Sequence, residues 1–421
     1  MKIISTSDWH LGNMFHGNDR LPEHKHFLGW LIRQLKERQP DALLVAGDIF
    51  DNGNPSAASQ SAYYEFLADA TEACPDMQVI IIAGNHDSAN RLEAPRALLA
   101  RHKVEIRGTV RRRWEKTEDG GVWVFDYDDL MIPVTGRDGE EAVVLAVPYL
   151  RGDILQSSDY SVGVNDFLHR LTDRAREVFP GKRLVMMAHM YASGAEIAKS
   201  EASEKIVIGG QEEVNMEGWT GHPDYLTCGH IHKRQHIWNT DWARYTGSIL
   251  PMSFAECGYT HGVDLVTFAE GKRKPEVTLL EYVPQHRLRV LPDDVEGASP
   301  KDLKKLIARE LSDRTGDSLD DGFVYLALKV RMDKVNIDDI KELEAQVDKK
   351  NAVLCKIEKC VPEIGITTIA GRREVQSIDD IASRDPLEAL KEAFVVKNGT
   401  EMSERQEQML KELLESIKPG I

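Results

Sequence analysis

Five short apolar segments in this chain are each followed at once by acidic, imidazole or amide side chains. The segments are Ile3-Ile4, Ala42–Ala46, Val79–Ala83, Leu184–Ala188 and Tyr225–Cys228. Runs of this length, rich in Val and Ile and set between helical stretches, predict buried strands. The expected helices between them are Glu23–Arg38, Ser56–Ala73 and Asn165–Val178. The pattern therefore predicts an α/β fold in which each of these strands ends in polar residues.

The polar residues after the strands form one ordered series. They are Ser7-Asp8-Trp9-His10, Gly47-Asp48, Gly84-Asn85-His86-Asp87, His189 and Gly229-His230-Ile231-His232. A lone histidine is more often a satisfied core or surface residue, but five such junctions in order are hard to explain by chance. Ligands gather beyond the carboxyl ends of strands in sheets of this type. We therefore expect these side chains to converge on one edge, with sharp backbone turns at the glycines.

The donor set indicates two divalent metal ions. It combines carboxylate, imidazole and carboxamide groups without thiolate, which suits Mn²⁺ or a similar cation such as Mg²⁺. Seven side chains are too many for one ion but suit two ions that share a bridging carboxylate. They are Asp8, His10, Asp48, Asn85, His189, His230 and His232. Two ions roughly 3.5–4 Å apart can activate a water for in-line displacement at phosphorus. His86 is placed to protonate the leaving oxygen, a step worth roughly 10²–10⁴ in rate.

The overall charge decides neither for nor against DNA as a substrate. The chain has 421 residues and a net charge of -16. Binding to the phosphate backbone relies on clustered Lys and Arg, so an acidic average argues against a generally basic surface. Cations bound at the site would offset part of the acidic charge. A local basic run, Arg107–Lys116, is either a DNA contact or a solvated loop.

The remaining composition predicts a cytoplasmic protein of two to three domains. No apolar run approaches the ~20 residues that span a bilayer, so no membrane partner is expected. The five cysteines form no C-x-x-C pair, so neither a zinc ribbon nor a disulfide framework is indicated. Because Met1–Ser7 already reads as a buried strand, we expect no signal peptide.

The five junctions resemble the calcineurin-like metallophosphoesterase superfamily. Further stretches narrow the resemblance to the bacterial SbcD-type nucleases, relatives of the Mre-type nucleases of archaea and eukaryotes. These stretches are Ser7–Gly12, Gly47–Asp51, Val147–Arg151, Ser203–Gly210, Tyr245–Ser248 and Met252–Phe254. The resemblance is strong to about residue 285 and looser beyond it. It implies a β-sandwich flanked by helices over residues 1–285, a smaller α/β cap domain that contacts DNA over 286–370, and C-terminal helices over 371–421.

The resemblance also assigns the ligands. One ion would be held by Asp8, His10, Asp48 and His232, and the other by Asp48, Asn85, His189 and His230, so that Asp48 bridges. His86 matches the family's catalytic histidine. Asp51 stands where archaeal and eukaryotic relatives have a second histidine. We expect Asp51 to orient His86, with capping of the next helix as the alternative.

The family's activity is Mn²⁺-dependent cleavage of DNA, by exonuclease action on duplex ends and endonuclease action on single strands and hairpins. It works with an SbcC-type coiled-coil ATPase in DNA end processing, repair and recombination. By resemblance, this chain forms a homodimer and, with the ATPase, a heterotetramer. The expected dimer contact includes the apolar stripe Tyr63, Phe66, Leu67 and Ala70 together with Leu92–Leu99, although core packing also explains that stripe.

The sequence after Gln285 changes its pattern. Strands are expected at His286–Leu291, Phe323–Met332 and Ala352–Val361, with helices at Pro300–Asp313 and Asn336–Lys350. A cap that grips DNA and a purely stabilising accessory domain are both consistent with this alternation. Two apolar stripes follow at helical spacing, Leu387-Leu390-Phe394 and Leu410-Leu413-Leu414-Ile417. They either pack on this protein or bind the base of the ATPase's coiled coil.

Two other classes of function remain open. A metallophosphoesterase that acts on small phosphate esters or nucleotides would use the same metal ligands, but the extra domain and terminal helices favour a large substrate and a partner. A non-catalytic scaffold would ordinarily have lost ligands, whereas all seven and His86 are present. Cleavage polarity, the physiological metal, the dependence on ATP and the DNA-contacting basic residues do not follow from the sequence.

Overall fold

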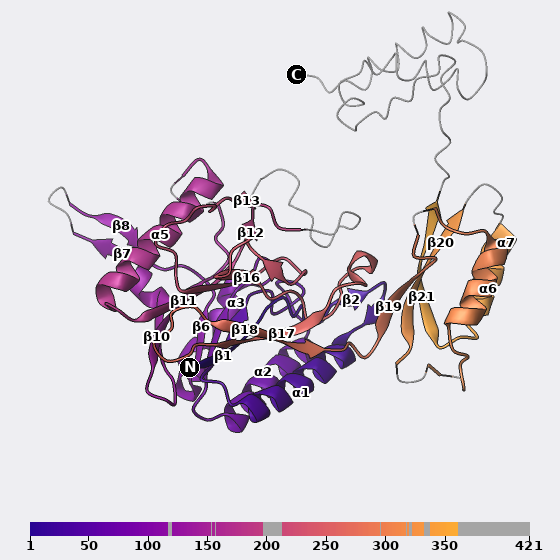
Figure 1. Ribbon diagram of the computed structural model, residues 1–421, viewed down its shortest axis with the longest axis horizontal. Coiled ribbons are helices and arrows are strands. Elements are labelled where there is room, and N and C mark those ends of the chain that lie inside the picture. The colour runs from indigo at the N-terminus through magenta and orange to yellow at the C-terminus, as the bar shows by residue number, and fades with distance from the viewer. Residues whose placement is uncertain are drawn as a thin grey trace, which may run out of the picture. The chain divides into compact units, whose positions relative to one another are not determined.

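The computed structural model describes residues 1–116, 120–152, 154–155, 157–196, 213–294, 296–316, 318–319, 322–331 and 337–360. Two six-stranded sheets dominate it (Figure 1). The first has the strand order β18 (Glu276–Tyr282), β17 (His261–Thr267), β1 (Lys2–Thr6), β4 (Ala42–Ala46), β5 (Gln78–Ile82) and β6 (Val104–Arg107). The second has the order β15 (Gln235–His236), β16 (Ala243–Tyr245), β14 (Tyr225–Gly229), β11 (Arg183–His189), β10 (Glu141–Val147) and β9 (Met131–Thr135).

Both sheets contain four parallel strands, with antiparallel pairing at one edge of the first sheet and at both edges of the second. In the first sheet β1, β4, β5 and β6 run parallel, β17 pairs antiparallel with β1, and β18 pairs antiparallel with β17. In the second sheet β10, β11, β14 and β16 run parallel, while β9 and β15 are antiparallel. Parallel strands buried on both faces need apolar residues at every position, which is why the expected strands read as uninterrupted apolar runs.

The sheets pack face to face and helices cover their outer sides. Side chains such as Leu44 and Ile80 from the first sheet share one buried cluster with Val144, Met187 and Tyr225 from the second. Helices α1 (Leu21–Arg38) and α2 (Ala57–Ala73) pack on the outer face of the first sheet, and α5 (Tyr160–Val178) packs on that of the second. The expected helix-flanked sandwich is therefore confirmed.

Local capping sets where two of these helices begin. The hydroxyl of Ser56 accepts a hydrogen bond from the backbone N–H of Ser59, at 3.1 Å, and α2 begins at Ala57, the residue after Ser56. The carboxylate of Asp159 accepts from the backbone N–H of Val162 at 3.0 Å, so α5 begins at Tyr160. The sequence prediction placed that start five residues too late, because it followed the apolar spacing and overlooked the N-cap.

The apolar stripe assigned to the dimer contact packs instead in the core. Tyr63, Phe66, Leu67 and Ala70 are all at most 3% exposed and belong to the cluster beneath α1 and α2. The other expected contact segment, Leu92–Leu99, spans the end of α3 (Ala89–Glu93) and all of α4 (Arg96–Leu99), with Pro95 between the two helices. Two neighbouring apolar side chains that do not belong to the stripe, Tyr64 and Leu98, are exposed.

A third sheet forms a smaller α/β unit after the sandwich. Its order is β19 (Arg287–Leu291), β20 (Val324–Arg331) and β21 (Ala352–Cys360), all parallel, with α6 (Pro300–Glu310) and α7 (Ile337–Val347) packed on it. These are the elements that the sequence predicted, with slightly different ends. The expected C-terminal helices and Ser203–Gly210 lie outside the described residues.

A buried joint connects this unit to the sandwich. Phe15 and Phe254 share a cluster with Leu288, Tyr325 and Ala327. The Tyr325 hydroxyl donates to Glu23 Oε1 at 2.9 Å, and Glu23 pairs with Arg20 at 3.0 Å, with both charged side chains buried. An ion pair so deeply buried is tolerated only when its hydrogen bonds are satisfied.

The remaining described elements are short. They are β2 (Met14–Phe15), β3 (Asn18–Asp19), β7 (Arg112–Glu115), β8 (Val122–Phe125), β12 (Tyr191–Ala192), β13 (Glu213–Val214), η1 (Ala100–His102), η2 (Tyr127–Leu130) and η4 (Phe254–Glu256). Among the residues that the structure describes, no helix has both the length and the apolar character to cross a lipid bilayer.

Candidate metal centre

The predicted ligands meet where the two sheets face each other. Asp8 and His10 follow β1, Asp48 follows β4, and Asn85 follows β5, all in the first sheet. The others come from the second sheet, where His189 ends β11 and the pair His230 and His232 follows β14. The sequence predicted one shared edge. The structure instead brings together the carboxyl ends of strands from two sheets, which widens the range of directions from which donors approach.

Four of the seven predicted ligands have a left-handed backbone. The φ angles are 51° at Asp8, 46° at His10, 49° at Asp48 and 99° at His230. Such angles are uncommon for residues with a side chain, and each costs of order 1–3 kcal/mol. Because four such residues occur together, the surrounding structure must hold their backbones in conformations that residues with a side chain do not adopt by local preference.

Two glycines permit the close approach of the ligand loops. A Cβ atom at Gly84 would lie 2.1 Å from Asp48 Oδ1, and one at Gly229 would lie 2.1 Å from the carbonyl oxygen of Ala46. Both distances are far below van der Waals contact. The absence of a side chain at these positions is therefore what lets the strands β4, β5 and β14 place their terminal residues side by side.

We predict that Gly84→Ala disturbs the centre. The added methyl group must displace the Asp48 carboxylate or backbone, and overpacking of this kind typically costs about 1–3 kcal/mol. A lower melting temperature and weaker Mn²⁺ binding are both expected. Gly316→Ala is the matched control, because a Cβ atom there meets nothing within 4 Å. Unchanged Mn²⁺ binding in Gly84→Ala would contradict the close packing described here.

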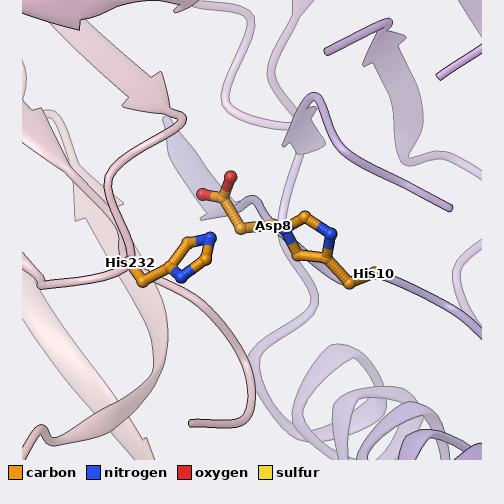
Figure 2. Close-up of side chains that lie close together, drawn as sticks. All are labelled: Asp8, His10 and His232. Atoms are coloured by element: carbon orange, nitrogen blue, oxygen red, sulfur yellow. The ribbon is translucent and has the colours of Figure 1, made fainter. Parts of the chain in front are cut away.

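One cluster of donors consists of Asp8, His10 and His232. Their potential ligand atoms lie within 4.8 Å of one another, and all three residues are buried. Figure 2 shows these side chains approaching from two segments that are far apart in the sequence. Among the residues that the structure describes, neither ring nitrogen of His10 has a hydrogen-bond partner. Because a buried polar atom without a partner is costly, the unpaired imidazole fits a position beside a metal ion.

A second cluster centres on the side-chain oxygen of Asn85. This Oδ1 lies 2.9 Å from Nε2 of His189 and 3.0 Å from Nδ1 of His230. Asp48 Oδ2 is 3.3 Å from His189 Nε2 and 3.8 Å from His10 Nε2. Asp48 therefore lies between the two clusters, where a bridging carboxylate is required. The residues present fit two divalent ions.

Electrostatics inside the centre suit cation binding. Burial would raise the pKa of Asp48, but the imidazoles of His189 and His10 hold it well below its usual range. Burial would likewise lower the pKa of His189, and the Asp48 carboxylate raises it to about 9. Burial lowers the pKa of His10 well below its ordinary value, so this ring is neutral. Metal ions displace protons from such ligands, so the proton on His189 marks a position that a cation can take.

His86 lies at the rim of the centre and is only partly buried. Its ring stands edge-on to that of His10, with centroids 4.8 Å apart. Nδ1 lies 2.9 Å from the carbonyl oxygen of Asp51. Because a carbonyl oxygen only accepts, Nδ1 carries the hydrogen and Nε2 is the nitrogen left for a substrate. His86 also falls within one group of possible ligands, with His10 and Asp48.

Asp51 contacts His86 through its main chain, not through its carboxylate. The carboxylate accepts a hydrogen bond from Asn13 Nδ2 at 2.9 Å and lies 3.8 Å from His10 Nδ1. The helix after it, α2, is capped by Ser56. The contact with His86 is thus made by the main chain of Asp51 and the cap of α2 by Ser56, while the Asp51 carboxylate lies beside a predicted ligand.

Two buried carboxylates of the centre received no role from the sequence. Asp87 accepts hydrogen bonds from the backbone N–H groups of Ile49 (3.1 Å), Phe50 (3.0 Å) and Gly84 (2.9 Å), which ties the two loops after β4 and β5 together. Glu256 lies 3.4 Å from His232 Nδ1. Asp87 belongs to the conspicuous Gly-Asn-His-Asp block, whereas no local pattern marks Glu256.

The basic run Arg107–Lys116 offers little free positive charge. Arg107 pairs with Glu105 at 2.8 Å, Arg111 with Glu93 at 3.1 Å, and Arg113 with Glu115 at 2.9 Å. The Arg112 guanidinium lies over the Phe125 ring, with its central carbon 5.1 Å from the ring centroid. Acidic neighbours thus offset much of the charge of this run, for which the sequence left a DNA contact and a solvated loop as alternatives.

Comparisons with known proteins agree with this geometry. Residues 1–234 match the family model described as calcineurin-like phosphoesterase. The chain is 35% identical over 340 residues to the SbcD subunit of nuclease SbcCD from Rhodobacter capsulatus, covering 78% of this chain and 80% of that protein. It is 32% identical over 286 residues to the SbcD subunit from Escherichia coli K12, covering 65% and 66%. The corresponding Bacillus subtilis protein is 30% identical over 274 residues, covering 65% and 67%.

Two solved structures are distant matches. The protein TT1561 of Thermus thermophilus has a TM-score of 0.35 and 14% identity, covering 66% of this chain and 98% of that one. A dimetal phosphatase from Danio rerio has a TM-score of 0.38 and 11% identity, with the same coverage of 66% and 98%.

Proposed function

The chain belongs to the calcineurin-like phosphoesterase family, as one of its SbcD-type nuclease subunits, and we propose that it is a two-metal phosphodiesterase that cuts DNA. One observation carries the proposal. Seven oxygen and nitrogen donors from five strand ends converge without any thiolate, and Asp48 lies between the two clusters. Family membership supports hydrolysis of a phosphoester bond, and the relatives' name, nuclease, supports DNA as the substrate.

The donor chemistry supports Mn²⁺ as the metal, because borderline cations accept mixed carboxylate, imidazole and amide ligands. Asp8, His10, Asp48 and His232 would hold one ion, and Asp48, Asn85, His189 and His230 the other. When bound, two such ions supply an activated water and stabilise charge on the phosphate oxygens.

Proton transfer to the leaving oxygen is assigned to His86. The bond from Nδ1 to the Asp51 carbonyl fixes the ring's orientation, and Nε2 is the nitrogen that can reach a substrate. A histidine in this role must carry a proton on Nε2 when the phosphorus–oxygen bond breaks. The position of the ring beside His10, and its partial exposure, support contact with a ligand entering from solvent.

The proposal is tested by incubating the purified protein with Mn²⁺ and four substrates in parallel. These are linear duplex DNA, hairpin DNA, single-stranded DNA and a small phosphate ester. We expect cleavage of at least one DNA substrate that stops on addition of a chelator. Rapid turnover of the ester with intact DNA would favour the alternative, a metallophosphoesterase of small molecules.

We further propose a homodimer that assembles with an SbcC-type coiled-coil ATPase, since the relatives are named as subunits of a two-protein nuclease. The surface formed by α2 and α4 supports the dimer. Tyr64 is 40% exposed and Leu98 is 63% exposed, and both line a cavity of about 670 Å³. The molar mass in solution tests this arrangement.

The terminal stripe Leu410-Leu413-Leu414-Ile417 is the proposed docking site for the ATPase. It lies outside the described residues, so the argument rests on its helical spacing and on the general use of amphipathic helices in partner grooves. Changing Leu410 and Leu414 to Asp should abolish co-purification with the ATPase, while cleavage of single-stranded DNA continues.

A matched pair controls for the added charge. Gln408 and Ser416 fall on the polar side of the same spacing, and changing both to Asp should leave the association intact. Normal association of the Leu410/Leu414 variant combined with a much lower melting temperature would show that the stripe packs on this protein instead.

A further inference from the structure

Glu256 is a fully buried carboxylate that touches a predicted metal ligand. It is 0% exposed and lies 24 residues beyond His232 in the sequence. Its Oε1 is 3.4 Å from His232 Nδ1, while Oε2 accepts a hydrogen bond from the backbone N–H of Met252 at 2.8 Å. The Ser253 hydroxyl donates to Oε1 at 3.2 Å. A charge removed so completely from water is costly unless its partners compensate.

The His232 ring contacts both Glu256 and the proposed metal cluster. Nδ1 faces Glu256, whereas the ring also belongs to the cluster with Asp8 and His10. Figure 2 shows a ring nitrogen of His232 on the side of the Asp8 carboxylate. Histidines that bind metal ordinarily donate their second N–H to a carboxylate or carbonyl, which fixes the ring and makes the ligating nitrogen more basic.

The segment that carries Glu256 is itself held in place. The carbonyl oxygen of Pro251 accepts a hydrogen bond from Arg20 Nη1 at 2.5 Å, and Arg20 is fully buried. Phe254 is 6% exposed and packs against Phe15, with ring centroids 5.3 Å apart. These contacts fix the segment that carries Glu256, so its carboxylate is held in place against His232. A residue that positions another side chain must itself be held in this way.

We propose that Glu256 is a positioning residue that orients His232 toward the ion of the Asp8 and His10 cluster. The inference rests on the proposed metal centre, and it adds a residue outside the seven predicted ligands. His189 is oriented differently, since its Nδ1 lies 2.9 Å from the backbone carbonyl of Ala46. A carboxylate is a stronger hydrogen-bond acceptor than a carbonyl. The ring of His232, which faces Glu256, is therefore expected to be polarised more strongly than the ring of His189, which faces a backbone carbonyl.

The decisive experiment measures Mn²⁺ binding by calorimetry in the full-length chain. Glu256→Gln keeps the shape but presents an amide where the Met252 N–H and the His232 N–H both need an acceptor. We expect one of the two ions to bind about 10- to 100-fold more weakly, while the affinity of the other is unchanged. Ser253→Ala, which removes one hydrogen bond to Glu256, should weaken the same ion by a smaller factor.

Asp41→Asn is the matched control. Asp41 is another buried carboxylate, and it accepts hydrogen bonds from the backbone N–H groups of Lys2 (2.7 Å) and Arg137 (3.0 Å) at the opposite end of β4 from Asp48. This variant should bind both ions as the parent does. Normal binding of both ions by Glu256→Gln and Ser253→Ala, with only lower melting temperatures, would overturn the positioning role. If the parent protein bound no Mn²⁺, the proposed metal centre itself would be refuted.

Discussion

Replacing Asp48 with Asn should remove both metal ions from the centre and abolish cleavage. Asp48 lies 3.3 Å from His189 and 3.8 Å from His10, so its charge serves both clusters. Loss of a residue that only orients a ligand costs roughly 10–100-fold in metal affinity, and loss of a shared charged ligand should exceed that for each ion. Mn²⁺ titration with occupancy counted per chain measures the effect.

Asp8→Asn is the comparison for this prediction. Asp8 belongs to the cluster of His10 and His232 and is not a member of the proposed Asn85 cluster, so its loss should weaken mainly one ion. Asp8 also lies near Asp48 and His189, within 4.8 Å between possible ligand atoms. If Asp8→Asn nevertheless weakens mainly one ion while Asp48→Asn weakens both, the difference reflects bridging by Asp48 and not proximity alone. If Asp48→Asn affected a single ion, the bridging role would be excluded.

The second large effect is expected from His86→Ala. If His86 transfers a proton and does not bind metal, cleavage should fall by about 10²- to 10⁴-fold, while two Mn²⁺ ions still bind with the parent's affinity. Both quantities should be measured on one preparation. His86 contacts Asp48 through its backbone N–H, at 2.9 Å from Oδ1, and His86→Ala keeps this hydrogen bond, so the proposed bridging carboxylate should stay in place.

A histidine outside the centre controls for general effects of truncation. His169 is exposed on α5, where its ring contacts Trp219, with centroids 5.0 Å apart, and His169→Ala should cut DNA at the parent's rate. Loss of one ion in His86→Ala would reassign this residue as a ligand, in keeping with its place beside His10 and Asp48. Unimpaired cleavage would remove it from the mechanism altogether.

The candidate donors could be picked out in the sequence because they stand at or within a few residues of the end of a largely apolar strand. Asp8 after β1 and His189 at the end of β11 illustrate this, since a fully buried strand and its polar end are local features. The division of these strands between two sheets could not be predicted in the same way. A buried parallel strand has the same composition in either sheet, and strand pairing is set by contacts between distant segments.

Other parts of the site depend on contacts that no local pattern records. Glu256 reaches His232 only through the folding of the segment after β16, and the spacing of 24 residues has no periodic meaning. Asp51 was expected to orient His86, and the atom of Asp51 that contacts the His86 ring is its backbone oxygen. A sequence shows which side chain is present, whereas which atom of a residue faces a partner depends on the φ and ψ angles of the folded loop.

The joint around Arg20, Glu23 and Tyr325 has a consequence for exchanging parts between relatives. A chimera that replaced everything after Gln285 with the equivalent region of another protein would keep Arg20 and Glu23 but lose the hydroxyl that Tyr325 donates to Glu23. It would also leave Phe15 and Phe254 facing unmatched side chains. The two regions are therefore matched to each other across this joint, and we expect grafts to fold best where both sides of the joint are transferred together.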